Sequence, residues 1–167
     1  MNMTNSELEL RHEHVFDVRT NFDRRWLAGP LAGGSKQGYT SVGEGSTVVG
    51  PWLNGKIVDY SGADWPLVRA DAVVELNAHY MIQADDGALI YIRNLGYVHG
   101  PLRSRGKPAE DPPDIPAYFR CTPYFRAPEG VHDWLNRTVI VGVGKRVPKL
   151  TANDAPDHSL FRYFAVR

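Results

Sequence analysis

The feature that most constrains the fold is a stretch of alternating apolar and polar residues that ends in a tight-turn signal. Between Asp71 and Gln83, one set of alternate positions is almost entirely apolar: Ala72, Val74, Leu76, Ala78, Tyr80 and Ile82. The intervening positions are mainly polar. Strand side chains alternate between two faces, so the pattern predicts a strand with one apolar face. Asp85-Asp86-Gly87 and a second strand-forming run at 88–94 follow, which together predict a β-hairpin.

Further runs of strand-forming residues recur along the chain, at 8–19, 46–49, 56–60, 117–125, 135–143 and 160–166. We find no sustained helical spacing, and the one helix expected is a short one within 23–27. The 16 glycines and 12 prolines suit a chain of many short strands. About eight strands with little helix predict an all-β fold, an antiparallel barrel or sandwich formed by residues 1–167 as one domain.

Two segments are predicted to be long loops. Residues 21–45 are rich in glycine, and residues 100–116 contain five prolines, namely Pro101, Pro108, Pro112, Pro113 and Pro116. Proline cannot donate to a strand ladder, so the second segment should connect strands. Connections of this length are often lids, binding loops or oligomer contacts, and the alternative is a plain surface excursion.

Composition excludes several classes of function. The chain has 167 residues, with 19 basic and 19 acidic side chains, so its zero net charge argues against a nucleic-acid partner. A single cysteine, Cys121, allows no internal disulfide and no cysteine-based zinc site. His12 and His14 share a strand face without a third ligand, so we expect no metal and no cofactor. We expect a cytoplasmic location and no membrane partner, because no signal-peptide pattern or long apolar run is visible.

An ordered set of motifs resembles the DUF3237 family, also called UPF0311. The motifs are GADWPLVRAD at 62–71, VELNAHY at 74–80, DDGALIYIRNLG at 85–96, YFRCTP at 118–123 and HDWLN at 132–136. The resemblance implies a compact eight-stranded antiparallel barrel similar to allene oxide cyclase. It also implies a cytoplasmic protein that is often oligomeric, so we expect a homo-oligomer. Related barrels cyclise or isomerise small apolar molecules, or only bind them, and fold alone does not fix chemistry.

This chain departs from the family pattern at one place. The family usually has Leu-Asp-Ala-Arg-Tyr where this sequence has Leu76-Asn77-Ala78-His79-Tyr80. If the face that carries Glu75, Asn77 and His79 points into the barrel, His79 is a candidate acid–base catalyst and Asn77 a candidate hydrogen-bond donor to a developing oxyanion. The alternative is that this polar face meets solvent, as is common in antiparallel sheets.

Other candidate site residues come from neighbouring strands and turns. Tyr118 is predicted as a catalytic acid. The candidate substrate-binding residues are Glu75, Tyr91, Arg93, Arg120, Thr122, Trp134, Asn136 and Trp65. Each has a structural alternative, such as a solvated charge, a core aromatic ring or an asparagine that stabilises a turn.

These residues support two functional hypotheses of different kinds. The first is a cofactor-free enzyme that performs proton-transfer chemistry, namely isomerisation, cyclisation or hydration and dehydration, on a small, largely apolar carbonyl or phenolic compound in a barrel cavity. The second is a barrel that binds a small hydrophobic or aromatic ligand without catalysis. A structural subunit that uses a strand face for oligomer contact is a third possibility. The direction of the His79 side chain decides between these hypotheses. If Leu76 and Tyr80 point into the barrel, His79 points outward and cannot act on a ligand in the lumen.

Overall fold

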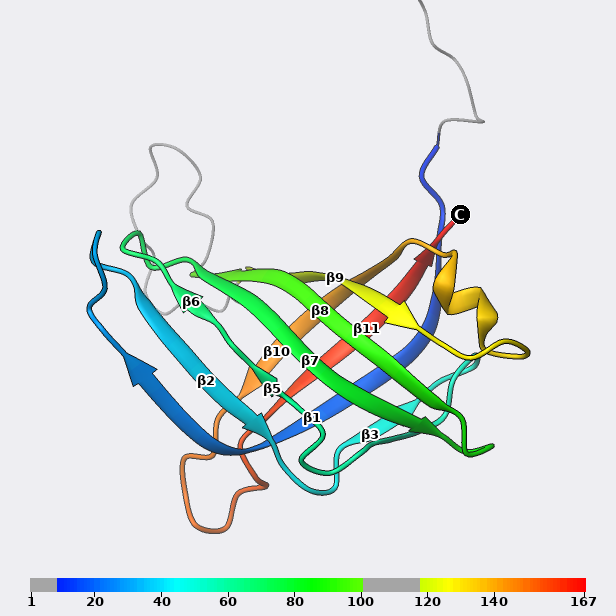
Figure 1. Cartoon of the computed structure of the whole chain (residues 1–167), viewed down its shortest axis with the longest axis horizontal. Coiled ribbons are helices and arrows are strands. Elements are labelled where there is room, and N and C mark those ends of the chain that lie inside the picture. Colours follow the sequence, from blue (N-terminus) through cyan, green and yellow to red (C-terminus); the bar gives the residue numbers. More distant parts are fainter. Residues whose placement is uncertain (1–8, 101–117) are drawn as a thin grey trace, which may run out of the picture.

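The computed structural model describes residues 9–100 and 118–167, and this part of the chain is built almost wholly from strands (Figure 1). The strands are β1 (His12–Ala28), β2 (Lys36–Val42), β3 (Thr47–Val49), β4 (Gly55–Ile57), β5 (Ala63–Asp64), β6 (Leu67–Val68), β7 (Val74–Ala84), β8 (Leu89–His99), β9 (Tyr118–Arg126), β10 (Ile140–Val147) and β11 (His158–Val166). A short 3₁₀ helix, η2 (Asp133–Asn136), precedes β10. No helix in the described ranges is long and apolar enough to cross a membrane.

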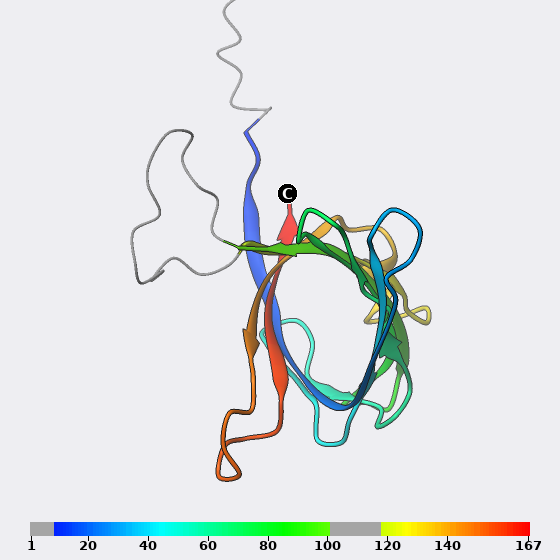
Figure 2. The same ribbon diagram turned by 90° about the vertical axis from the view of Figure 1, so that its left-hand side faces the viewer.

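The strands form one antiparallel sheet that closes on itself. In ring order, β4, β3, β1, β11, β10, β9, β8 and β7 are hydrogen-bonded neighbours, and β4 pairs again with β7. At the other end, β2 and β5 take the places of β3 and β4 between β1 and β7. Eight strands therefore surround the axis at either end, which confirms the predicted all-β barrel; the closed ring is visible end-on in Figure 2.

The predicted hairpin is confirmed. β7 and β8 pair in register from Val74 opposite Val98 to Gln83 opposite Leu89. The turn is closed by a hydrogen bond from the Gly87 N–H to the Ala84 carbonyl at 2.8 Å. Gly87 has a φ of +88°, a conformation that glycine adopts without a steric penalty.

One predicted loop is wrong. Residues 21–45 contain the second half of β1 and all of β2, which pair from Phe22 opposite Val42 to Ala28 opposite Gln37. The helix expected within 23–27 is strand as well. Glycine suggested a loop, but here Gly38 lets the backbone pass close to Pro66, because a Cβ at this position would lie 2.7 Å from the proline ring. The predicted loop at 100–116 lies, apart from Gly100, outside the described residues.

The strand expected at 135–143 also differs from the structure. Its first residues form η2, and β10 runs from Ile140 to Val147. Leu135 still joins the core from the 3₁₀ helix, where it is 2% exposed. The predicted strand therefore starts five residues before the observed one, because Leu135 is buried by the 3₁₀ helix and not by a strand.

The apolar face of β7 is the inner one. Tyr80 and Ile82 are 3% and 0% exposed, whereas His79 and Met81 are only half-buried. Near the Asp85–Gly87 turn, apolar side chains fill the barrel, including Ile57, Ile82 and Ile90, each 0% exposed. Burial of such a side chain contributes about 1.5–3 kcal/mol. This end of the barrel is therefore a packed core, and any internal cavity lies toward the start of β7.

Candidate functional site

A small cavity of about 40 Å³ lies inside the barrel beyond this core. Its lining comes from seven strands and consists of Thr20, Phe22, Val42, Asp64, Leu76, Ala78, Tyr80, Asn94, Phe119, Ser159 and Phe161. Ala78 pairs with Asp64 on one neighbouring strand and with Asn94 on the other. Its small side chain leaves space between these two inward-facing residues. Phe22, Asp64 and Leu76 are partly exposed, so the cavity approaches the surface at this end.

Three buried polar atoms of residues that line this cavity have no hydrogen-bond partner of normal geometry in the described part of the chain. They are the hydroxyl oxygens of Thr20 and Tyr80 and the side-chain carbonyl oxygen of Asn94. These residues are 3%, 3% and 1% exposed. Leaving a buried polar atom unpaired costs about 1–3 kcal/mol, and such atoms are scarce in folded proteins. Three of them on residues around one cavity make this cavity the candidate functional site inside the barrel.

Asp64 adds a titratable carboxyl group to the same cavity. Burial raises its pKa from 3.8 to about 6, although the backbone N–H groups of Asn77 and Trp65 and the charge of Arg25 act in the opposite direction. The Asn77 N–H donates to Asp64 Oδ1 at 2.9 Å, which fixes the carboxyl group against β7. A carboxyl group with this pKa exchanges protons close to neutral pH, as a general acid–base catalyst must.

Neighbouring buried groups hold the lumen side chains in place. The side-chain amide of Asn94 donates to the Tyr163 hydroxyl at 3.0 Å, which leaves its carbonyl oxygen directed elsewhere. Burial raises the pKa of both Tyr80 and Tyr163, so both phenols keep their protons at neutral pH. Burial also raises the pKa of Cys121 to about 11, so this thiol is a packing group and not a thiolate nucleophile.

The residues that the sequence singled out lie outside the barrel. His79 Nδ1 lies 2.6 Å from the Tyr91 hydroxyl, and His79 Nε2 lies 3.0 Å from Asn77 Oδ1. Arg93 Nε donates to the same Asn77 oxygen at 3.1 Å. The structure thus brings these four residues together, but on the outer face. This corrects the expectation that Asn77 and His79 face the lumen: their alternation partners Ala78 and Tyr80 occupy the inner face.

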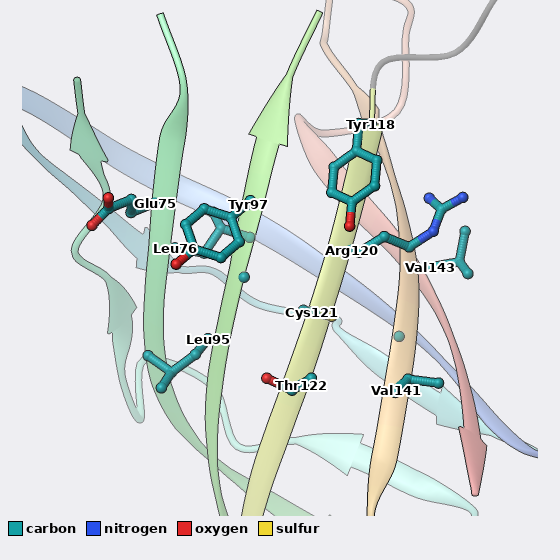
Figure 3. Close-up of a pocket in the computed structure, with 12 residues that line it drawn as sticks. Glu75, Leu76, Leu95, Tyr97, Tyr118, Arg120, Cys121, Thr122, Val141 and Val143 are labelled. Atoms are coloured by element: carbon teal, nitrogen blue, oxygen red, sulfur yellow. The ribbon is translucent and has the colours of Figure 1, made fainter. Parts of the chain in front are cut away.

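A second group of predicted residues lines an outer groove of about 660 Å³ across β7, β8, β9 and β10 (Figure 3). It contains Glu75, Tyr118, Arg120 and Thr122, and it corrects their predicted place in a lumen site in the same way. Tyr118 stacks on His99 with ring centroids 4.6 Å apart, and the Arg120 guanidinium lies 5.3 Å from the Tyr118 ring. Glu75 pairs with Arg69 at 3.2 Å.

The remaining predicted residues lie apart from both groups. Trp65 is 50% exposed and packs edge-on against Tyr39 at 4.6 Å. Trp134, in η2, packs against the Trp52 ring at 5.4 Å. Asn136 holds a turn by accepting from the Ala127 N–H at 2.8 Å and donating to the Ala127 carbonyl at 2.9 Å. The structure therefore gives these side chains packing and turn contacts and does not join them to the lumen.

The lumen residues escaped the sequence analysis, although a signal was present. Asn94 follows Ile90 and Ile92 at alternate positions, so a polar amide lies on an otherwise apolar strand face. Tyr80 belongs to the apolar set of the preceding strand, but its ring carries a hydroxyl group. A polar atom in a strictly apolar series marks either a strand end or an internal site. Asp64 carried no such signal, because β5 is only two residues long.

Comparison with known proteins shows to which family the chain belongs. The family described as protein of unknown function (DUF3237) matches residues 10–163. The chain belongs to the DUF3237 family. A UPF0311 protein of Rhodopseudomonas palustris is 30% identical over 142 residues, which cover 82% of this chain and 89% of that protein.

Solved structures share the fold of this DUF3237 chain. A β-barrel-like protein from Acinetobacter baumannii is similar with a TM-score of 0.80 and 25% identity, covering 95% of this chain and 97% of the other. A structure described as an enzyme from Penicillium herquei is similar with a TM-score of 0.65 and 18% identity, covering 95% of each chain. The second likeness shows the fold alone.

Proposed function

We propose that this DUF3237 protein is an acid–base enzyme that acts inside the barrel on a small, largely apolar carbonyl or phenolic compound. The observation that carries the proposal is the cavity lined by Asp64, where the side-chain oxygens of Thr20, Tyr80 and Asn94 have no hydrogen-bond partner among the residues that the structure describes. Asp64 takes the acid–base role that the sequence had suggested for His79. The distant fungal neighbour, described as an enzyme, supports catalysis on this fold.

The side chains suit transfer of a proton next to a carbonyl group. The Asp64 carboxylate removes a proton from the carbon beside the carbonyl, and the electrons of the C–H bond move to the carbonyl oxygen to give an enolate. The Thr20 and Tyr80 hydroxyls donate hydrogen bonds to that oxygen, which stabilises its charge in a site shielded from water. If the substrate carries a β,γ double bond, this enolate is a dienolate, and Asp64 returns the proton to the γ carbon, so the double bond moves into conjugation with the carbonyl and no proton is gained or lost overall.

The size of the cavity limits what enters it. A space of about 40 Å³ admits one small functional group, whereas sites that enclose a whole drug-sized ligand measure about 300–1,000 Å³. The reacting end of the substrate therefore lies among the polar atoms, and its apolar body lies against the partly exposed rings and chains near Phe22 and Leu76. Asn94 Oδ1 is a hydrogen-bond acceptor, so a hydroxyl group of the substrate would donate a hydrogen bond to it.

The outer groove is less suited to this chemistry, although it is much larger. Tyr97 is 52% exposed there, and Arg120 is also exposed, so water reaches the polar groups that line it. Hydrogen bonds from such groups compete with solvent and stabilise a developing charge weakly. The lumen combines shielding, unpaired polar atoms and a carboxyl group, and we infer that it is the reactive site.

Exchange of deuterium into acetophenone tests the proposal. In heavy water, the wild-type protein should accelerate exchange at the methyl group beside the carbonyl, as measured by proton NMR. Asp64→Asn should reduce that acceleration by about 100-fold or more, because general acid–base groups contribute roughly that factor. His79→Ala, the matched outer-face control, should exchange at the wild-type rate. Equal rates for wild type and Asp64→Asn would remove Asp64 from its role.

The carrier hypothesis makes a different prediction for the same compound. A binding barrel would show acetophenone-dependent shifts in the amide resonances of Tyr80 and Asn94 without any acceleration of exchange. Tyr80→Phe would then weaken binding by removing one hydrogen bond to the ligand, worth about 0.5–1.5 kcal/mol. Binding without exchange would therefore select the carrier over the enzyme.

A further inference from the structure

A cluster of three charged side chains lies at the end of the barrel where the cavity nears the surface. Arg25, on β1, contacts Asp157 with its Nη2 atom 2.7 Å from Asp157 Oδ2. Arg146, on β10, contacts Asp157 Oδ1 from the other side. Asp157 immediately precedes β11, and its backbone carbonyl accepts from the Phe22 N–H at 2.9 Å. The cluster therefore spans three strands of the barrel wall.

Phe22 links this cluster to the cavity. Its ring lines the cavity, and the guanidinium carbons of Arg25 and Arg146 lie 5.3 and 4.7 Å from the ring centroid. Both are within the range of cation–π attraction, which fixes the guanidinium groups above the ring. Arg25 also lowers the pKa of Asp64 by its charge, so its field reaches the cavity. The two cations consequently lie over a ring that forms part of the cavity wall.

The cluster has more positive than negative charge. Two guanidinium groups share the single carboxylate of Asp157, and one Arg146 nitrogen also donates to the His158 carbonyl at 2.7 Å. The Arg25, Arg146 and Asp157 side chains are 48%, 30% and 27% exposed, so a ligand can reach them. The adjacent Arg24 pairs with Asp23 at 3.4 Å and is 71% exposed, which makes it a suitable outward-facing comparison.

We propose that Arg25 and Arg146 bind an anionic group, a carboxylate or a similar single anion, at the end of the substrate opposite its reacting carbonyl or phenol. This inference rests on the proposed function and narrows its substrate class to an amphipathic anion. The planar guanidinium groups match the two oxygens of a carboxylate. The apolar body of the substrate would lie between this anchor and Asp64, along Phe22 and the neighbouring cavity wall.

The test compares para-acetylbenzoate with para-acetylbenzamide, which differ only in the charged end. Isothermal titration calorimetry with the full chain should give about tenfold tighter binding of the carboxylate, as expected for a partly exposed charge-assisted contact. Arg25→Gln should remove this preference by weakening the carboxylate about tenfold and leaving the amide unchanged. Arg24→Gln, the matched control, should keep the wild-type preference.

A second variant changes the preference in the opposite direction. Asp157→Asn removes the carboxylate that competes for the two guanidinium groups, so para-acetylbenzoate should bind severalfold tighter. Equal affinities for the two compounds in the wild type, equal weakening of both by Arg25→Gln, or no binding of para-acetylbenzoate would each overturn the anchor. Thermal unfolding of each variant confirms that the compared proteins are folded.

Ala78→Leu separates failure of the anchor from failure of the lumen site, because the larger side chain fills the cavity. If it abolishes binding of both compounds while they bind the wild type equally, the lumen site stands and the anchor is wrong. If both compounds bind Ala78→Leu as they bind the wild type, the compounds do not occupy the lumen, and the proposed function and the anchor fail together.

Discussion

The two faces of the barrel wall differ in whether their polar side chains have hydrogen-bond partners. On the outer face, polar groups are paired: His79 with Tyr91, Arg93 with Asn77, and Arg162 with Asp17 through two contacts of 2.9 Å. On the inner face, the side-chain oxygens of Thr20, Tyr80 and Asn94 have no hydrogen-bond partner within the described ranges, although these residues are almost fully buried. These outer groups are paired and accessible, whereas the three inner oxygens are unpaired and shielded. An incomplete network in a shielded place is the better indication of a binding site.

Adjacent residues of β7 provide the sharpest test of this contrast. Ile82 is 0% exposed inside the barrel, and Met81 is half-buried on the outer face. Ile82→Ala should lower the free energy of unfolding by about 2–5 kcal/mol because it removes buried contacts and leaves a cavity. Met81→Ala should lower it by less than about 1 kcal/mol. Urea unfolding measures both, and similar losses would contradict the assignment of the faces.

Asp64→Asn should stabilise the protein at neutral pH. The pKa of Asp64 is about 6 in the folded protein, whereas an aspartate without the fold around it has a pKa of 3.8. Folding therefore disfavours the ionised form of this carboxyl group. Wild-type stability should therefore fall as the pH rises from about 4 through about 6, by up to about 3 kcal/mol. The asparagine variant avoids this loss and should be the more stable protein at pH 7. A stability difference that stays constant from pH 3 to pH 7 would contradict the raised pKa.

Tyr80→Phe should have a smaller effect on stability, and of unusual sign. Its hydroxyl has no hydrogen-bond partner of normal geometry among residues 9–100 and 118–167, so its removal eliminates an unpaired buried group and leaves the ring in place. We expect stability to be unchanged or raised by about 1 kcal/mol in the absence of ligand. Thermal unfolding measures this effect. A loss of 2 kcal/mol or more would mean that the hydroxyl makes a stabilising hydrogen bond in solution.

His79→Ala should have the smallest effect. Its two hydrogen-bond partners on the outer face are reached by water, so solvent replaces the lost contacts. The pKa of His79 is lowered by burial and by the charge of Arg93, so the imidazole is neutral at pH 7 and its loss removes no ion pair. We expect a change of less than about 1 kcal/mol in urea unfolding. A larger loss would show that the outer network is structural.

The sequence predicted the class of fold and the best-defined part of it. Alternation along 71–83 and the Asp85–Gly87 turn determine a hairpin, because side-chain direction and turn geometry depend on neighbouring residues alone. The same local rules failed at 21–45, where Gly38 lies within β2 and allows a close approach to Pro66 instead of forming a loop. That contact joins residues far apart in the sequence, so no local pattern reports it.

The candidate site depended on information that the sequence did not contain. Alternation separated His79 from Tyr80, but only closure of the sheet decided that Tyr80 faces the lumen and His79 the outside. Asp64, Asn94, Thr20 and Ser159 come from four strands and meet only because the ring closes. Burial, which raises the pKa of Asp64, is a property of this assembly and not of a residue. The sequence by itself determined the β7–β8 hairpin and which of its residues share a face, because alternation and turn geometry are local. The tertiary structure decided which face encloses the cavity, because closure of the sheet joins strands that are distant in the sequence.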